Sequence, residues 1–163
     1  MQKLGEHPMI KAMLKFIYPL ASNEYITERL ANCNSIRDFQ TKILARGIQN
    51  VLTRSSHGLT TSGFDALEKD TSYLFISNHR DIILDTSLLN ISLFYCDLVM
   101  TASAIGDNLV HKSFLLELSK VNRNFLVQRD LGPREMLKSS KLMAEYIAEN
   151  LMNDSRSIWI AQR

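Results

Sequence analysis

Three residues within a stretch of seven could carry out proton-transfer chemistry: His79, Asp81 and Asp85. The two carboxylates are four positions apart, so on a helix that begins near residue 81 they lie on the same face. A neutral histidine held by a carboxylate takes a proton from a hydroxyl, and the carboxylate stabilises the imidazolium that forms. The sequence therefore predicts a general base, His79, with Asp85 or Asp81 as its partner. The simpler alternative is that Asp81 only caps the helix and that His79 is an ordinary loop residue.

Short apolar runs separated by helical patterns surround these residues. Four runs are expected to be strands: Tyr73–Ser77, Leu98–Ala102, Asn124–Gln128 and Ser157–Ala161. The runs are continuous rather than alternating, which is typical of strands buried on both faces. The helical patterns between them are Thr86–Phe94, Val110–Leu118 and Arg134–Leu151. This alternation predicts an α/β fold, in which right-handed βαβ units build a mainly parallel sheet with flanking helices.

The first third of the chain is expected to be helical instead. Apolar residues recur at helical spacing in Met9–Ile17 and again in Ile36–Val51, the pattern of amphipathic helices. An additional strand is expected near His57–Phe64, because its Thr-rich centre is β-prone. The sequence thus predicts an N-terminal helical segment, residues 1–55, packed on an α/β domain, residues 56–163.

The composition is that of a globular protein. Of the 163 residues, 45% are hydrophobic and 22% are charged, which is near the average and excludes disordered, collagen-like and disulfide-scaffold classes. No apolar run approaches the ~20 residues that span a bilayer, and no signal peptide opens the chain, so a cytoplasmic location is expected. Cys33 and Cys96 lack metal-binding spacing and are expected to be free thiols.

Charge is unevenly distributed along the chain. Residues 1–55 have a net charge of +4, whereas the remainder has a net charge of −2. The basic helices could face anionic lipid as a peripheral contact on the inner membrane surface, or an acidic carrier protein. Alternatively, they are a solvated helical face. No nucleic-acid partner is expected, because the chain has no dense basic stripe.

Binding sites in open parallel sheets lie beyond the carboxyl ends of the strands. Polar residues follow all four expected strands, at positions 78–81, 104–108, 128–130 and 162–163. Arg129 could bind phosphate through its bidentate guanidinium, or it could pair with Asp130 or Asp107. Arg80 could contact phosphate or anchor the helix start, and Asn108 could contact substrate or belong to a turn and helix cap. A base, an acid and cations suit a phosphate-bearing alcohol as substrate.

The segment Phe75–Asp85 (FISNHRDIILD) resembles the first signature block of the glycerolipid acyltransferases, which include 1-acylglycerol-3-phosphate and glycerol-3-phosphate acyltransferases. Asn124–Arg129 resembles their second block, a strand that ends in an Arg that helps to bind the acceptor's phosphate. The resemblance extends from about Leu59 to Arg163. It implies acyl transfer from acyl-CoA or acyl-carrier protein to a hydroxyl of a glycerol-phosphate-type acceptor, in phospholipid biosynthesis, without metal or cofactor. It also implies that His79 is the base and an Asp its partner.

The sequence departs from that family's pattern at two points. Five residues rather than four separate His79 from Asp85, so either the turn has one extra residue or Asp81 has taken the partner's role. The family's third block, a Glu-Gly turn with basic residues, does not follow the last apolar run before Arg163. We therefore expect a fragment of a longer protein, which folds but is inactive or nearly so by itself. A non-catalytic lipid- or carrier-binding fragment is the alternative function.

Three other classes of enzyme fit these residues less well. A metal-dependent phosphoesterase needs a second His/Asp cluster at ligand spacing. A serine hydrolase needs a G-x-S-x-G elbow, and a protein kinase needs a Gly-rich loop and a metal-binding Asn where Thr86 stands. The sequence contains none of these features.

Overall fold

The computed structural model describes residues 8–81, 84–153 and 156–162. The chain divides into two compact units, Met1–Ser62 and Gly63–Arg163. The boundary expected from the sequence, between residues 55 and 56, lies slightly earlier in the chain. The packing of the first unit on the second stays a prediction.

The first unit is built from helices: α2 (Pro8–Ile17), α3 (Asn23–Ala31), α4 (Ile36–Asp38), a π-helical segment (Phe39–Leu44) and α5 (Ala45–Ser55). Serine N-caps start two of them. The Oγ of Ser22 accepts the Tyr25 N–H at 3.1 Å, and the Oγ of Ser35 accepts the Asp38 N–H at 3.0 Å. The last three segments follow one another without a break from Ile36 to Ser55, which confirms the long helix expected there.

Apolar side chains from these helices form the core of the first unit: Leu14, Ile17, Ile26, Leu30, Phe39, Ile43 and Ile48. The hydroxyl of Tyr18 donates to the Ile43 carbonyl at 2.5 Å, and burial raises the pKa of Tyr18. Gly47 of α5 lies so close to Ile17 that a Cβ at this position would overlap the Ile17 side chain. These contacts hold the end of α2 against α5.

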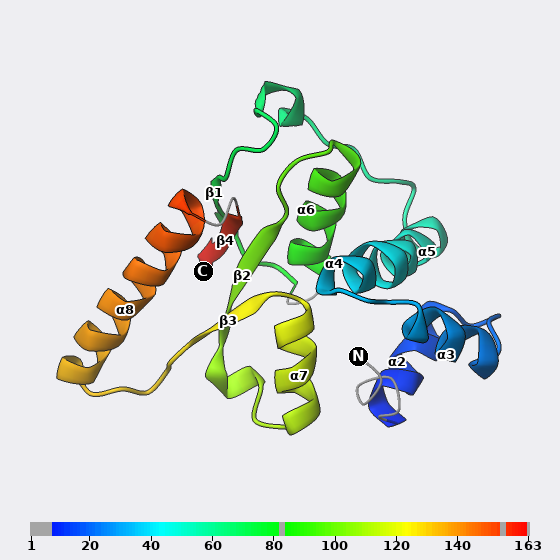
Figure 1. The fold of residues 1–163 in the computed structure, drawn as a ribbon, viewed down its shortest axis with the longest axis horizontal. Coiled ribbons are helices and arrows are strands. Elements are labelled where there is room, and N and C mark those ends of the chain that lie inside the picture. The colour runs from blue at the N-terminus through cyan, green and yellow to red at the C-terminus, as the bar shows by residue number, and fades with distance from the viewer. Residues whose placement is uncertain (1–7, 82–83, 154–155, 163) are drawn as a thin grey trace. The chain divides into compact units, whose positions relative to one another are not determined.

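The second unit contains a four-stranded, all-parallel sheet within the described residues (Figure 1). Its strands are β1 (Leu74–Asn78), β2 (Thr101–Gly106), β3 (Asn124–Val127) and β4 (Ser157–Gln162), in the spatial order β1-β4-β2-β3. The connecting helices are α6 (Leu84–Tyr95), α7 (Ser113–Val121) and α8 (Pro133–Met152). This arrangement confirms the predicted α/β fold.

The helices lie on both faces of this sheet, with α6 and α7 on one face and α8 on the other (Figure 1). The connections from β1 to β2 and from β2 to β3 run toward one edge, whereas the connection from β3 to β4 returns. Right-handed crossovers place connections of opposite direction on opposite faces. The return inserts β4 between β1 and β2, so β4 and β2 are central and carry buried residues such as Ile158, Trp159 and Ala102.

Two expectations about the strands themselves are wrong. β1 is not buried on both faces, since Leu74 and Ile76 are 45% and 59% exposed. The reason is its position as an outer strand of the described sheet, where fewer neighbours cover it. The other outer strand, β3, departs from the expectation in the same way, since Leu126 is 41% exposed. β2 begins at Thr101 rather than Leu98, because the Leu98 N–H donates to the Leu93 carbonyl at 2.9 Å and so completes the end of α6.

The segment His57–Phe64 is not a strand, which corrects a third expectation. Residues 57–63 are exposed, and Gly58 and Gly63 have positive φ values. A β-prone segment without an apolar face to bury gains little from its propensity. The helix expected from Val110 also begins later, at Ser113, because a 3₁₀ turn occupies Asp107–Leu109.

The longest described helix, α8, is only partly covered by the sheet. It has 20 residues, and its exposed apolar side chains are Met136, Leu137, Leu142, Tyr146 and Met152. Within the described ranges, no helix combines the length and the apolar character needed to cross a membrane.

Candidate active site

The carboxyl ends of the four strands lie level with one another at one edge of the sheet. Asn78 at the end of β1 pairs with Gln162, and Gly106 at the end of β2 pairs with the last residue of β3. Ser103 pairs with Trp159, and this register, continued by three residues, sets Gly106 beside Gln162. Adjacent strands are ~4.8 Å apart, so the rim from β1 to β3 spans about 14 Å.

His79 and Asp85 contact each other in the turn between β1 and α6. The distance from His79 Nδ1 to Asp85 Oδ2 is 3.0 Å, and the two side chains are 25% and 24% exposed. A carboxylate beside Nδ1 favours the tautomer that carries its proton there. The Nε2 atom then remains as the proton acceptor, which is the geometry of a general base with an orienting acid.

The backbone around the turn holds Asp85 in this position. The His79 N–H donates to the Gln162 carbonyl at 3.1 Å and so extends the β1–β4 ladder by one bond. The Oδ2 of Asp85 accepts the N–H groups of Arg80 at 2.7 Å and of Asp81 at 2.9 Å. Asp85 lies in the first turn of α6, where the helix dipole also favours a negative charge.

The pKa of Asp85 is lowered by this environment. Partial burial by itself would raise the pKa, but the hydrogen bonds from the Asp81 and Arg80 N–H groups and from His79, together with the charge of the ring, outweigh it. Asp85 is therefore an ionised carboxylate at neutral pH, ready to stabilise a protonated ring.

Asp81, the other candidate partner, caps α6. Its Oδ1 accepts the Leu84 N–H at 2.7 Å, which is the role that N-cap carboxylates commonly have. Asp85 makes the hydrogen bond to His79 described above. The catalytic roles of His79, Asp85 and Asp81 stay predictions.

Trp159 of β4 supports the histidine and was not singled out by the sequence. Its ring lies 5.9 Å from the His79 ring, centroid to centroid, in an edge-to-face arrangement. Its Nε1–H donates to the Oγ of Ser77 at 2.9 Å, and the Ser77 hydroxyl donates to the Asn78 carbonyl at 3.1 Å. Trp159 is buried, so it restricts the orientations open to the imidazole.

A buried polar network fixes α6, and with it Asp85, on β2. Asn90 receives the Thr101 N–H on its Oδ1 at 2.7 Å and donates from Nδ2 to the Thr101 hydroxyl at 2.9 Å. The hydroxyls of Thr86 and Ser103 lie 2.8 Å apart. Buried polar groups satisfied in this way specify one packing of helix on sheet.

Arg129 and Asn108 come together above the end of β2. A Cβ at Gly106 would lie 3.2 Å from Arg129 Nε and would overlap the side-chain oxygen of Asn108. The Arg129 N–H, and not its guanidinium, contacts Asp107, at 3.1 Å from Oδ1. Among the described residues, no carboxylate forms an ion pair with the Arg129 guanidinium. The structural pairing with Asp107 thus uses the backbone, and the guanidinium lies over the rim.

The remaining candidates are less informative. Arg80 is exposed beside His79, and a phosphate contact for its side chain stays a prediction. Arg163 lies outside the described residues. The described ranges contain no group of three or more His, Cys, Asp or Glu side chains arranged to hold a metal ion.

No model of a known protein family matches this chain, and no curated protein matches it significantly. The resemblance to glycerolipid acyltransferases therefore depends on the short segments in which it was found.

The lowered pKa of Asp85 predicts a pH-dependent contribution to stability. A carboxyl whose pKa is lower in the folded than in the unfolded chain stabilises the fold above its unfolded pKa of about 3.9, and this contribution is lost as pH falls through the folded value. We expect Asp85→Asn to lower the free energy of unfolding at neutral pH, and the difference from wild type to vanish in acid. Urea unfolding at several pH values measures it through Trp159, the chain's single tryptophan.

The control for this prediction is Asp65→Asn, which changes an exposed carboxyl of the same unit. It should leave the free energy of unfolding unchanged at every pH. A deficit of Asp85→Asn that persists unchanged from neutral pH into acid would contradict the linkage, because a constant deficit arises from packing and not from charge.

Proposed function

We propose that this protein is an O-acyltransferase, which moves an acyl group from acyl-CoA or acyl-carrier protein to a hydroxyl of a glycerol-phosphate-type acceptor in phospholipid biosynthesis. The observation that carries the proposal is the 3.0 Å contact between His79 Nδ1 and Asp85 Oδ2 at the carboxyl end of a parallel strand. The sequence resemblance at Phe75–Asp85 and Asn124–Arg129 supports the choice of reaction.

In the proposed mechanism, His79 Nε2 takes the proton of the acceptor hydroxyl while that oxygen attacks the thioester carbonyl. The C–O bond forms, and the tetrahedral intermediate then expels the thiolate as the C–S bond breaks. The thiolate takes the proton back from the imidazolium, so the histidine returns to its neutral form. Asp85 stabilises the imidazolium during this cycle, and no further co-reactant is required.

The acceptor phosphate is assigned to Arg129, with Asn108 and Arg80 as additional contacts. Arg129 follows β3, but its Nε lies near Gly106 at the end of β2, two strand spacings, or about 10 Å, from β1. The His79 ring contacts Trp159 of β4, the strand between β1 and β2. A short phosphorylated alcohol can bridge such a gap. The proposed setting is the cytoplasm, with a peripheral contact to the inner membrane surface.

The test is a thioester-consumption assay on the protein as the cell makes it, together with the 163-residue chain. We expect free thiol to be released from acyl-CoA or acyl-carrier protein when glycerol 3-phosphate or a lysophospholipid is present, and not with glycerol alone. Thiol release that does not depend on an acceptor would contradict acyl transfer and indicate thioester hydrolysis. Binding of the acyl donor without any turnover would favour a non-catalytic carrier- or lipid-binding role.

A further inference from the structure

The corner between α2 and α3, residues Phe16–Ala21, presents apolar side chains to solvent. Leu20 is 99% exposed and Phe16 is 73% exposed, and Pro19 between them is exposed as well. Exposed apolar groups that lie together mark sites of interaction. This corner belongs to the first unit and takes no part in the chemistry of the proposed acyl transfer; the role inferred for it below rests on the proposed function only for its peripheral membrane setting.

The corner is held in one conformation by its hydrogen bonds. The Tyr18 N–H donates to the Leu14 carbonyl at 2.7 Å, and the Ala21 N–H donates to the Tyr18 carbonyl at 3.1 Å. The Tyr18 hydroxyl anchors the corner to the Ile43 carbonyl. Leu20 is thus displayed by a fixed turn, not by a loose segment.

Two cations flank the exposed apolar side chains. The Lys15 ammonium donates to the Ala21 carbonyl at 2.5 Å, and the Arg54 guanidinium donates to the Phe16 carbonyl at 3.4 Å. Glu24 is an opposing charge near Lys15, but the unit as a whole carries +4. Apolar side chains beside Lys and Arg form the pattern of surfaces that dock on anionic membranes.

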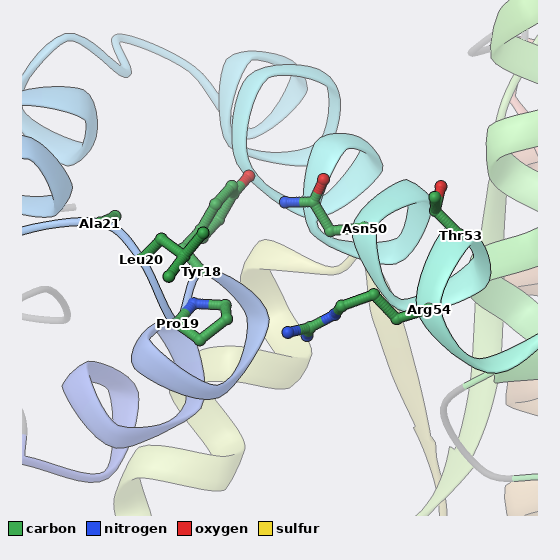
Figure 2. A pocket seen from close by; sticks show the side chains of 7 residues that line it. All are labelled: Tyr18, Pro19, Leu20, Ala21, Asn50, Thr53 and Arg54. Carbon is green, nitrogen blue, oxygen red and sulfur yellow. The ribbon is translucent and has the colours of Figure 1, made fainter.

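A cavity of about 270 Å³ opens beside this corner, between it and α5 (Figure 2). Asn50, Thr53 and Arg54 line it from α5, and Tyr18, Pro19, Leu20 and Ala21 line it from the corner. The Thr53 hydroxyl donates to the Gln49 carbonyl of its own helix. Among the side chains that line the cavity, the donors available to an anion are therefore the Arg54 guanidinium and the Asn50 amide.

We propose that this corner docks on an anionic phospholipid surface. Phe16 and Leu20 enter the boundary between headgroups and acyl chains, while Arg54 and Asn50 bind a lipid phosphate in the cavity and Lys15 faces the anionic headgroups. A second copy of the chain is a poorer occupant, because a symmetric contact at this corner would bring the Lys15 and Arg54 cations of both copies together.

Co-sedimentation of the full chain with lipid vesicles tests this proposal without any acyl donor or acceptor. We expect binding to phosphatidylcholine vesicles that contain phosphatidylglycerol, weaker binding to phosphatidylcholine alone, and loss of binding as salt is raised. Leu20→Asp and Phe16→Asp should each weaken binding at least about tenfold, since each removes an apolar side chain that the membrane buries on docking. Arg54→Gln should weaken binding to the anionic vesicles about fivefold.

The matched control is Ile36→Asp, which changes an exposed apolar residue elsewhere in the same unit and should bind as wild type does. Leu20→Trp keeps an apolar side chain at this position and should retain binding. The fluorescence of the added tryptophan should shift to the blue when anionic vesicles are added. Wild type that does not bind anionic vesicles, or Leu20→Asp that binds equally well, would overturn the proposal. A dimer in solution that Leu20→Asp dissociates would assign the corner to a second copy instead.

Discussion

Replacement of His79 by alanine is expected to lower kcat for acyl transfer by at least about 10²-fold, the contribution of a positioned general base. Without the imidazole, the acceptor hydroxyl attacks without the positioned base that removes its proton. The structure holds the ring between Asp85, at 3.0 Å, and the edge-to-face contact with Trp159. The change is measured as the rate of thiol release at saturating concentrations of acyl donor and acceptor. The assay uses whichever form of the protein is active in the thioester-consumption assay.

Three further variants make this result specific. His57→Ala changes an exposed histidine of the first unit and should leave kcat unchanged. Asp85→Asn should lower kcat strongly, because an amide no longer stabilises the imidazolium, whereas Asp81→Asn keeps a capping oxygen and should have a much smaller effect. Full activity of His79→Ala would remove the base from the mechanism, and a larger loss in Asp81→Asn than in Asp85→Asn would show that the wrong carboxylate had been chosen.

The sequence predicted the position of this site because its signals are local. A strand end, a following turn and the start of a helix are neighbours along the chain, so the order of residues alone places His79, Asp81 and Asp85 together. The choice between the two carboxylates required the backbone of the turn. There, the N–H groups of Arg80 and Asp81 converge on Asp85 in the first turn of α6.

Trp159 could not be associated with His79 from the sequence, because that requires the order of the strands. The two residues are far apart in the chain and become neighbours only because β4 inserts beside β1. The Asn90 network was missed for a related reason. A buried asparagine is recognisable only when its partner, Thr101, is known to face it across the interface of α6 and β2.

The errors at His57–Phe64 and Leu98–Ala102 show where local propensity fails. Both segments have β-prone residues. His57–Phe64 has no partner strand among the described residues. In Leu98–Ala102, the Leu98 N–H bonds to the end of α6 and not to a neighbouring strand. The wrong prediction that β1 is buried on both faces has the same cause, because an apolar run does not indicate whether its strand is central or at an edge of the sheet. Hydrogen-bond partners outside the segment itself decide all three cases.

Arg129 carries the second large expected effect, on acceptor binding. We expect Arg129→Ala to raise the KM for a phosphorylated acceptor about 10- to 100-fold, because a charge-assisted hydrogen bond to a guanidinium contributes ~1.5–3 kcal/mol. The KM for the acyl donor should change little. Arg129→Lys should recover only part of the loss, since an ammonium lacks the planar fork that binds two phosphate oxygens at once.

Gly106 offers an independent route to the same guanidinium. Its backbone has φ −65°, which alanine adopts without strain, but an added Cβ would lie 3.2 Å from Arg129 Nε and would overlap Asn108. Gly106→Ala should therefore displace the side chains of Asn108 and Arg129 while leaving the charge of Arg129 in place. We expect an increase in acceptor KM that is smaller than that of Arg129→Ala, and smaller still when Arg129 is already alanine, because only the Asn108 contact can then be disturbed.

β3 supplies the control for these measurements, because an arginine flanks each of its ends. Arg123 precedes the strand and lies at the amino edge of the sheet, whereas Arg129 follows it at the carboxyl edge. Arg123→Gln removes the same charge beside the other end of this strand and should leave the acceptor KM unchanged. Loss of phosphate recognition equally in both variants would mean that Arg129 acts through net charge alone. A phosphate-free acceptor such as monoacylglycerol, turned over slowly, should be insensitive to Arg129→Ala, because the interaction that the substitution removes is already missing.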